Sequence, residues 1–146
     1  MKMLVIAFTL LASVYTKSSS ANDGIVSPEV LKSFQTRFSG AKNADWTQTE
    51  DFYKVQFALD GQHITAFYKA DGTIAAFTRN VVVFQLPVNL QSSLKNEYKD
   101  YWVAGLFELS NDEGVHYYVT LENADMQLIM KSSAGMWETY QKKRKD

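Results

Sequence analysis

The sequence of 146 residues contains no cysteine, two prolines and seven glycines. Without cysteine the chain has no disulfide, no thiol nucleophile and no thiolate ligand for zinc or an iron–sulfur cluster. The low content of proline and glycine argues against long disordered or collagen-like segments. A folded domain must therefore be held together by its hydrophobic core alone.

Long hydrophobic runs are also missing, with one short exception near the N-terminus. Lys2 precedes an apolar run over residues 3–12, which is well under the roughly 18 residues that a membrane span needs. Ser19 and Ala21 are small residues at the spacing of a signal-peptidase site. We predict a cleaved signal peptide over residues 1–21 rather than a membrane anchor, and a periplasmic or secreted protein. Without a cysteine the protein is not a lipoprotein.

An excess of positive charge is lacking as well. The chain has 15 basic and 16 acidic residues, and removal of residues 1–21 takes away Lys2 and Lys17, which leaves 13 against 16 and a net charge of −3. This balance gives no general attraction for nucleic acid. The basic cluster at residues 142–145 is interpreted as a solvated tail rather than as a nucleic-acid or lipid site.

The first half opens with helix signals. Ser27 is a capping residue, Pro28 suits the first helical position, and an apolar stripe follows at helical spacing until Gly40. The stripe consists of Val30, Leu31, Phe34 and Phe38.

A loop containing Trp46 leads from this helix into a stretch of alternating residues that predicts antiparallel strands. Asp60-Gly61 and Asp71-Gly72 each mark a tight turn between two strands. Residues 81–86 indicate a further strand. The predicted pairs across the two turns are Phe57 with Ile64, Val55 with Ala66, Tyr53 with Tyr68, Ala66 with Phe77 and Tyr68 with Ala75.

The same order of elements returns in the second half. Pro87 is followed by a helical stripe, a loop with Trp102 and further alternating strands. Pro28 and Pro87 lie 59 positions apart, and Trp46 and Trp102 lie 56 apart, which indicates a degenerate tandem repeat. Both tryptophans are expected to fill the space between helix and sheet, although Trp102, which lies close in sequence to Tyr98 and Tyr101, has the better claim to exposure. We predict an α+β fold of two helix-plus-antiparallel-meander repeats, with both helices on one face of a sheet and the opposite face open. The repeats are residues 22–86 and 87–146.

Three segments of the first half resemble a known family. They are VLKSFQTRFSGAKNADW (residues 30–46), YKVQFALDG (residues 53–61) and FYKADG (residues 67–72). Their order is similar to that of the PepSY-like, β-lactamase-inhibitor-like exported proteins of Bacteroidetes, closely over residues 28–78 and loosely over residues 87–140. The resemblance implies helix–sheet units like those of the β-lactamase inhibitor protein (BLIP), whose open sheet face grips a protein. It carries no catalytic residue, and it does not imply inhibition of a β-lactamase, because fold does not fix function.

Catalytic patterns are not found in the sequence. His63 and His116, one in each half, fall on the face opposite the apolar set, and local spacing places no acid beside either. The carboxylate pairs lie in predicted turns, where acidic residues are common. There is no Gly-rich phosphate loop, no G-x-S-x-G and no H-E-x-x-H motif. We therefore expect no enzyme, no metal site and no cofactor. An enzyme would need the two histidines to converge with an acid.

The open face supplies the candidate binding residues. It mixes aromatic, polar and cationic groups, as the cores of protein interfaces do, and Phe67 and Tyr118 are expected to be exposed aromatics of the kind that mark contact sites. We expect a protein or peptide partner there, bound in an inhibitory or regulatory role. The alternatives are a homodimer contact, a plain solvated face, or a small-ligand carrier whose pocket is lined by Tyr53, Tyr68 and Tyr117. The predicted contact residues are Lys54, Gln56, His63, Phe67, His116, Tyr118, Thr120 and Ile129.

Overall fold

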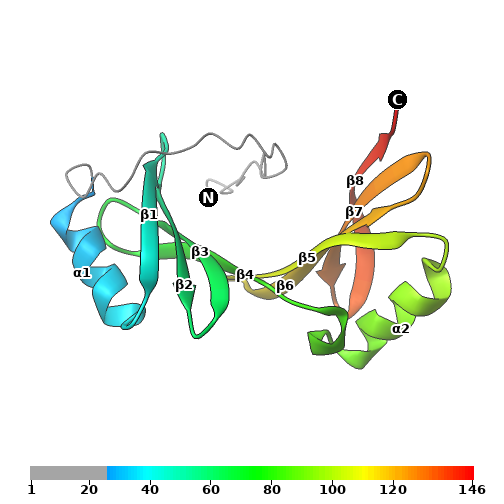
Figure 1. The fold of residues 1–146 in the computed structure, drawn as a ribbon, viewed down its shortest axis with the longest axis horizontal. Coiled ribbons are helices and arrows are strands. Elements are labelled where there is room, and N and C mark those ends of the chain that lie inside the picture. The colour runs from blue at the N-terminus through cyan, green and yellow to red at the C-terminus, as the bar shows by residue number, and fades with distance from the viewer. Residues whose placement is uncertain (1–25) are drawn as a thin grey trace.

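The computed structural model describes residues 26–146 (Figure 1). The predicted signal peptide and its cleavage site lie outside the described residues. Within residues 26–146 the strands form one eight-stranded antiparallel sheet in the order β1 to β8, and the predicted α+β fold is confirmed. No helix in this part of the chain is long and apolar enough to cross a membrane. The elements are α1 (Pro28–Arg37), β1 (Lys42–Gln48), β2 (Tyr53–Leu59), β3 (Gln62–Tyr68), β4 (Ile74–Asn80), the 3-10 turn η1 (Val83–Gln85), α2 (Val88–Glu97), β5 (Trp102–Asn111), β6 (Gly114–Glu122), β7 (Met126–Ser133) and β8 (Met136–Arg144).

Helix α1 forms where the sequence supplies its start and stop signals. The Ser27 hydroxyl accepts a hydrogen bond from the backbone N–H of Val30 at 3.4 Å, and Pro28 occupies the first helical position. Val30 and Phe34 are buried against the sheet. Beyond the helix, Gly40 adopts a φ of +88°, a conformation open to glycine that turns the chain into β1.

The two hairpins of the first half follow their turn signals with one departure. All three pairs predicted between β2 and β3 are present. Between β3 and β4, Tyr68 pairs with Ile74 rather than with Ala75, while the predicted pair beyond it is correct. The ladder shifts register between Phe67 and Tyr68, next to the turn, and such a bulge is not visible in a simple alternation of residues.

Residues 81–86, predicted as a strand, leave the sheet instead. Val81 still donates its N–H to the Leu106 carbonyl at 3.2 Å. The chain then turns, because the Gln85 side-chain oxygen accepts the N–H of Val82 at 2.9 Å and the Gln85 N–H donates to the Val82 carbonyl at 2.9 Å. Val81 and Leu86 are buried, so the apolar character of this segment anchors a turn and does not form a strand.

Trp46 and Trp102 lie in strands β1 and β5 rather than in loops. Trp46 is buried beneath α1, as predicted. Trp102 is 53% exposed and pairs with Glu122, so the prediction that it fills the helix–sheet space is wrong. The predicted basic tail is also largely part of the sheet, because β8 runs to Arg144 and pairs Lys142 with Leu128.

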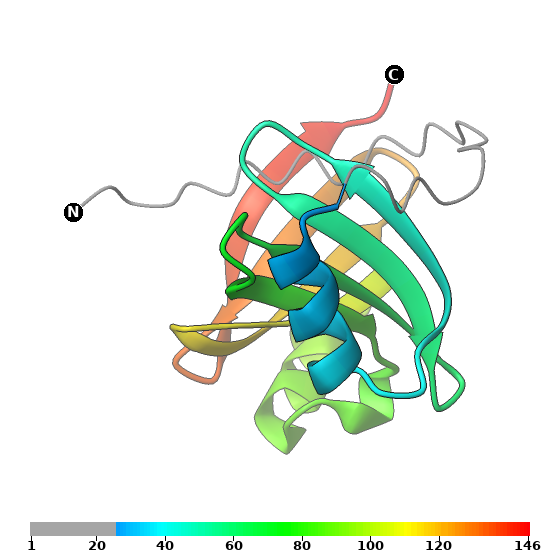
Figure 2. The ribbon, with the colours of Figure 1, turned by 90° about the vertical axis from the view of Figure 1, so that its left-hand side faces the viewer.

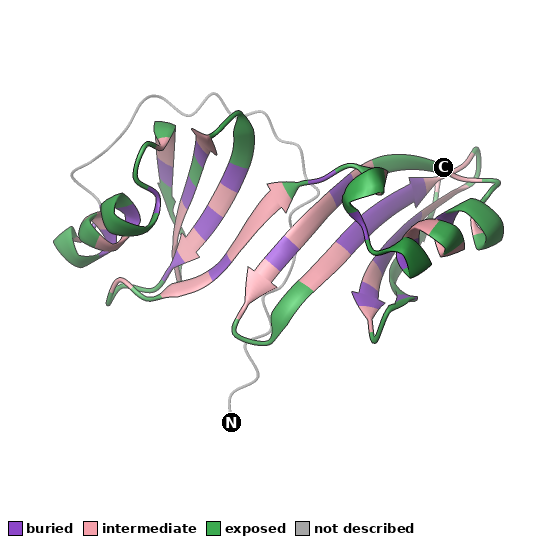
Figure 3. Cartoon of the chain, turned by 90° about the horizontal axis from the view of Figure 1, so that it is seen from below, coloured by how far each residue is buried: buried purple, intermediate pink, exposed green. Residues whose placement is uncertain are grey.

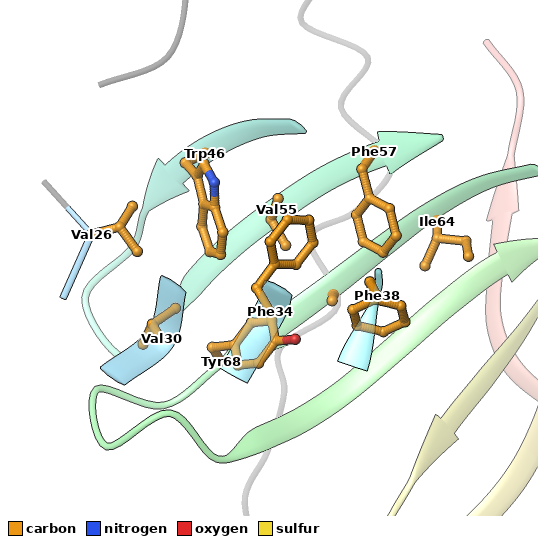
Figure 4. Close-up of a cluster of buried hydrophobic side chains, with 10 residues drawn as sticks. Val26, Val30, Phe34, Phe38, Trp46, Val55, Phe57, Ile64 and Tyr68 are labelled. Atoms are coloured by element: carbon orange, nitrogen blue, oxygen red, sulfur yellow. The ribbon is translucent and has the colours of Figure 1, made fainter. Parts of the chain in front are cut away.

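Both helices cover the same side of the sheet (Figures 1 and 2). Helix α1 covers a cluster of rings in which the Phe34 centroid lies 5.2 Å from that of Trp46 and 5.0 Å from that of Phe57 (Figure 4). Helix α2 covers a second cluster, in which the Leu90 carbonyl accepts the Trp137 indole N–H at 3.1 Å. The two clusters share no buried residue. One sheet therefore carries two separate cores on one side.

Candidate binding face

The side of the sheet opposite α1 and α2, here called the open face, carries all eight residues predicted as contacts. The pairing of the strands determines this, because directly opposed residues share a face and alternate residues change face. The pairs that place them are Lys54 with Phe67, Gln56 with Thr65, Ala58 with His63, Leu109 with His116, Phe107 with Tyr118, and Thr120 with Ile129.

These eight residues differ in exposure between the two halves. Gln56 and His63 are exposed, and the other two from the first half are partly buried. In the second half Tyr118 is only 7% exposed, and Thr120 and Ile129 are also buried. The expectation that Tyr118 is an exposed aromatic is therefore wrong. Figure 3 shows buried and half-buried residues along the strands of both halves and exposed residues on the outer surfaces of the helices.

Tyr118 is buried because aromatic rings cover it from two directions. The Phe107 ring stacks on it with centroids 5.2 Å apart and an interplanar angle of 7°, and Tyr140 meets it edge-on at 5.7 Å. Lys131 places its Nζ 6.0 Å from the centroid of the same ring. Burial raises the pKa of the Tyr118 phenol above its usual value, so the ring is neutral at physiological pH.

Tyr118 belongs to an apolar cluster on the open face, which we call the open-face cluster. It consists of Phe107, Leu109, Tyr118 and Ile129. None of its members belongs to the two cores beneath the helices. An antiparallel sheet with one solvated face normally presents polar residues there, so an apolar cluster on that face needs an explanation.

Sequence reasoning missed Phe107, Leu109 and Tyr140 as members or neighbours of this cluster. Phe107 and Leu109 alternate with Leu106 and Glu108 along β5, and this alternation was the available signal for the first two. Tyr140 gave no such signal. It reaches Tyr118 where the β7–β8 ladder shifts register between Ile129 and Met130, which leaves Tyr140 without a directly opposed partner.

An exposed aromatic also stands at the far end of the open face. The Lys145 Nζ lies 4.9 Å from the centroid of the Trp102 ring and 2.9 Å from Oε2 of Glu122. The Gln127 side chain donates to Oε1 of Glu122 at 2.7 Å, and this bond and the one from Lys145 lower the pKa of the Glu122 carboxyl. Trp102 is therefore held in place by a charged and hydrogen-bonded neighbourhood while half of its surface faces solvent.

The two histidines do not form one site. His63 is exposed on β3, whereas His116 is partly buried on β6, with Nδ1 3.3 Å from the Ser132 carbonyl oxygen and a buried Nε2 that has no hydrogen-bond partner. Strands three places apart are separated by about 14 Å. Among residues 26–146 no group of three His, Cys, Asp or Glu side chains is placed to hold a metal ion.

The space between α1 and the sheet is filled by side chains. Tyr68, one of the three rings proposed for a ligand pocket, is fully buried in the first core, and desolvation raises its pKa to about 12. A depression of about 460 Å³ lies between α1 and the β3–β4 turn. It is lined by polar and charged residues together with one glycine: Glu29, Lys32, Ser33, Thr36, Arg37, Asp71 and Gly72.

Comparison with known proteins concerns the fold. No family model matches the chain, and no curated protein matches its sequence. A BLIP-like protein from Bacteroides fragilis has a TM-score of 0.69 at 15% identity, covering 88% of this chain and 89% of its own. A DUF2874 family protein from Bacteroides uniformis has a TM-score of 0.71 at 11% identity, covering 82% and 89%. A protein from Bacteroides eggerthii, provisionally described as periplasmic, has a TM-score of 0.71 at 12% identity, covering 82% and 88%.

At these low identities the TM-scores establish a shared fold, and they say nothing about activity. The chain has the fold of BLIP-like proteins from Bacteroides, as the sequence resemblance implied. The structural similarity extends over most of each chain.

Proposed function

We propose that this chain is an exported, non-enzymatic protein that binds a protein or peptide through its open face. The observation that carries the proposal is the open-face cluster, an apolar and aromatic cluster on the side of the sheet that neither helix covers, with the exposed ring of Tyr140 lying against the buried ring of Tyr118. Tyr140 is 47% exposed, and Trp102, at the far end of the same face, is 53% exposed. Large aromatics at the centre of a surface, with polar and charged residues around them, are typical of protein contact sites.

The polar surroundings of the cluster support the same proposal. Lys131 borders Tyr118, and Glu138 pairs directly with Lys131 across β7 and β8. The first half adds a mainly polar surface through Lys54, Gln56 and His63. A partner would thus meet the exposed aromatic rings of Tyr140 and Trp102 in the second half and hydrogen-bonding groups in the first.

The cellular setting completes the proposal. The predicted signal peptide over residues 1–21 directs the chain out of the cytoplasm, and a periplasmic location agrees with the provisional description of one structural neighbour. The net charge of −3 predicted for the mature chain disfavours nucleic acid as the partner. The partner is an envelope or secreted protein, and a second copy of the chain is the alternative occupant.

Site-specific photocrosslinking in the producing cell tests this proposal. A photoreactive phenylalanine analogue placed at Tyr140 or at Gln56 lies on the open face, whereas the same analogue at Val115 lies on the helix side and serves as the matched control. Val115 is 54% exposed, comparable to Tyr140 at 47%. We expect a discrete protein adduct from Tyr140 and Gln56 and none from Val115.

The same experiment gives a clear contrary result. An adduct from Val115 alone, or no adduct at either open-face position, would show that this face is not the contact surface. If the adduct has twice the mass of the chain, the partner is a second copy. A purified heterologous partner should then lose affinity with Tyr140→Ala by about tenfold, as expected for one aromatic contact residue.

A further inference from the structure

A second exposed apolar surface lies at the connection between the two halves. Val82 is 59% exposed, Phe84 is 88% exposed and Val88 is 77% exposed. They belong to residues 82–88, a segment that contains η1 and ends at the first residue of α2, and which we call the apolar tip. In Figure 1 this segment lies at the lower edge of the second half, on the side of the sheet that carries the helices.

The apolar tip is held outward by its own hydrogen bonds. Val81 and Leu86 anchor it in the second core. The Gln91 side chain donates from Nε2 to the carbonyl of Leu86 at 2.7 Å and to that of Phe84 at 3.4 Å. Together with the bonds between Val82 and Gln85, these contacts fix the turn. A phenylalanine held almost fully in solvent by an ordered turn is prepared for contact, because little conformational freedom remains to be lost on binding.

The chain segment that contains the tip carries no charge. Residues 80–94 contain no Asp, Glu, Lys, Arg or His, and the exposed polar side chains among them are amides and hydroxyls, including Gln85, Asn89 and Ser92. A charged partner surface would find no complementary group there. An uncharged contact surface with amides around three apolar side chains suits the interfacial region of a lipid bilayer.

The size of the tip favours the same occupant. One phenylalanine and two valines offer about 400 Å² of apolar surface. This is roughly half of the 800 Å² that each partner contributes to a stable protein interface. Binding to a bilayer instead scales with the apolar area that is inserted, so a small apolar surface can still give weak binding.

We propose that the apolar tip is a membrane-contact site that inserts Phe84, with Val82 and Val88, into the interface of an uncharged or zwitterionic bilayer. The tip stands on the helix side of the sheet, so this contact turns the open face away from the membrane. Binding is weak and reversible, as expected for few inserted side chains. The proposal does not depend on the partner of the open face.

Vesicle binding by residues 22–146 tests the proposal. This chain contains the whole described fold and lacks the apolar run at residues 3–12, which would bind lipid by itself. With phosphatidylcholine–phosphatidylethanolamine vesicles, we expect Phe84→Glu to lower the bound fraction by about tenfold. Val115→Glu, a matched substitution of an exposed valine elsewhere, should leave it unchanged. Binding should also be equal at low and high salt, because no charge takes part.

A fluorescence measurement distinguishes insertion of the tip from non-specific adsorption of the protein to the vesicle. The chain lacks cysteine, so Val82→Cys and Val115→Cys each provide one labelling site for an environment-sensitive dye. We expect a blue shift on addition of vesicles from the dye at position 82 and none from the dye at position 115. Equal vesicle binding by the wild type and Phe84→Glu would overturn the proposal. So would an unchanged spectrum at position 82, which is also the result expected if the tip fits a protein pocket.

Discussion

Tyr68 combines complete burial with a hydroxyl that makes no hydrogen bond of regular geometry. The side chain is 0% exposed in the first core, and its hydroxyl lies near the Ser33 side chain without making a hydrogen bond of regular geometry. Burial raises the phenol pKa to about 12, although the nearby Arg37 charge acts in the opposite direction. The unfolded chain releases this proton at about pH 10, so the unfolded state binds fewer protons than the folded state between the two values. Stability therefore falls as the pH rises from about 10 to 12.

The substitution Tyr68→Phe tests both features of this residue. It removes a buried hydroxyl without changing the ring, so we expect the free energy of unfolding at neutral pH to be unchanged or raised by about 1 kcal/mol. Between about pH 10 and 12 the variant should lose less stability than the wild type. Denaturant unfolding followed by tryptophan fluorescence at several pH values provides the measurement. A clear loss of stability at neutral pH would mean that the hydroxyl forms a stabilising hydrogen bond. If the stability of the wild type and of the variant changed equally between about pH 10 and 12, the pKa of Tyr68 would not be raised.

At the scale of elements, the contact between α1 and the β3–β4 turn depends on one glycine. Gly72 has a φ of +87°, and a Cβ at this position would lie 2.8 Å from the Glu29 carbonyl oxygen in the first turn of α1. Gly61, in the β2–β3 turn, has a similar φ of +77°, but a Cβ there would meet nothing within 4 Å. The two glycines therefore share the need for a left-handed backbone and differ in the space around them.

Alanine at each position separates these two requirements. Gly61→Ala should cost about 1 kcal/mol of unfolding free energy, which is the strain of a left-handed backbone in an L-residue. Gly72→Ala should cost about 1–3 kcal/mol more, because helix and turn must move apart. Urea denaturation of the two variants beside the wild type gives the difference directly. Equal losses would contradict a tight approach of α1 to this turn.

Some elements of the fold could be predicted from the sequence and others could not. The Asp60-Gly61 turn fixed the β2–β3 register in advance, because a two-residue turn and an alternating apolar pattern allow one pairing. The η1 turn was mistaken for a strand, since its shape depends on side-chain bonds from Gln85 and Gln91 that an apolar run conceals. The burial of Tyr118 depends on Tyr140 and on a register shift in another hairpin. Local patterns carry no record of such long-range contacts.

At the scale of the whole molecule, two cores are connected by one ladder. Strands β4 and β5 pair from Ala76–Asn111 to Asn80–Phe107, and Arg79 makes two bonds to Glu108, at 2.9 and 3.0 Å. The cores themselves share no buried residue. Because the halves share backbone pairing but no core, unfolding of one half removes few buried contacts from the other. We therefore expect the halves to open as partly independent units.

Core truncations in either half test this independence. Phe34→Ala removes a ring that contacts three others in the first core, and Leu90→Ala removes a fully buried side chain from the second. Each should cost about 2–5 kcal/mol of stability within its own half. Hydrogen exchange followed by mass spectrometry should show lost protection in β1–β3 for Phe34→Ala and in β6–β8 for Leu90→Ala, with the other half close to wild type. An equal loss in both halves for each variant would show a single cooperative unit. In that case the open face would be a rigid surface across its full width, and a partner that binds one half would sense any change in the other.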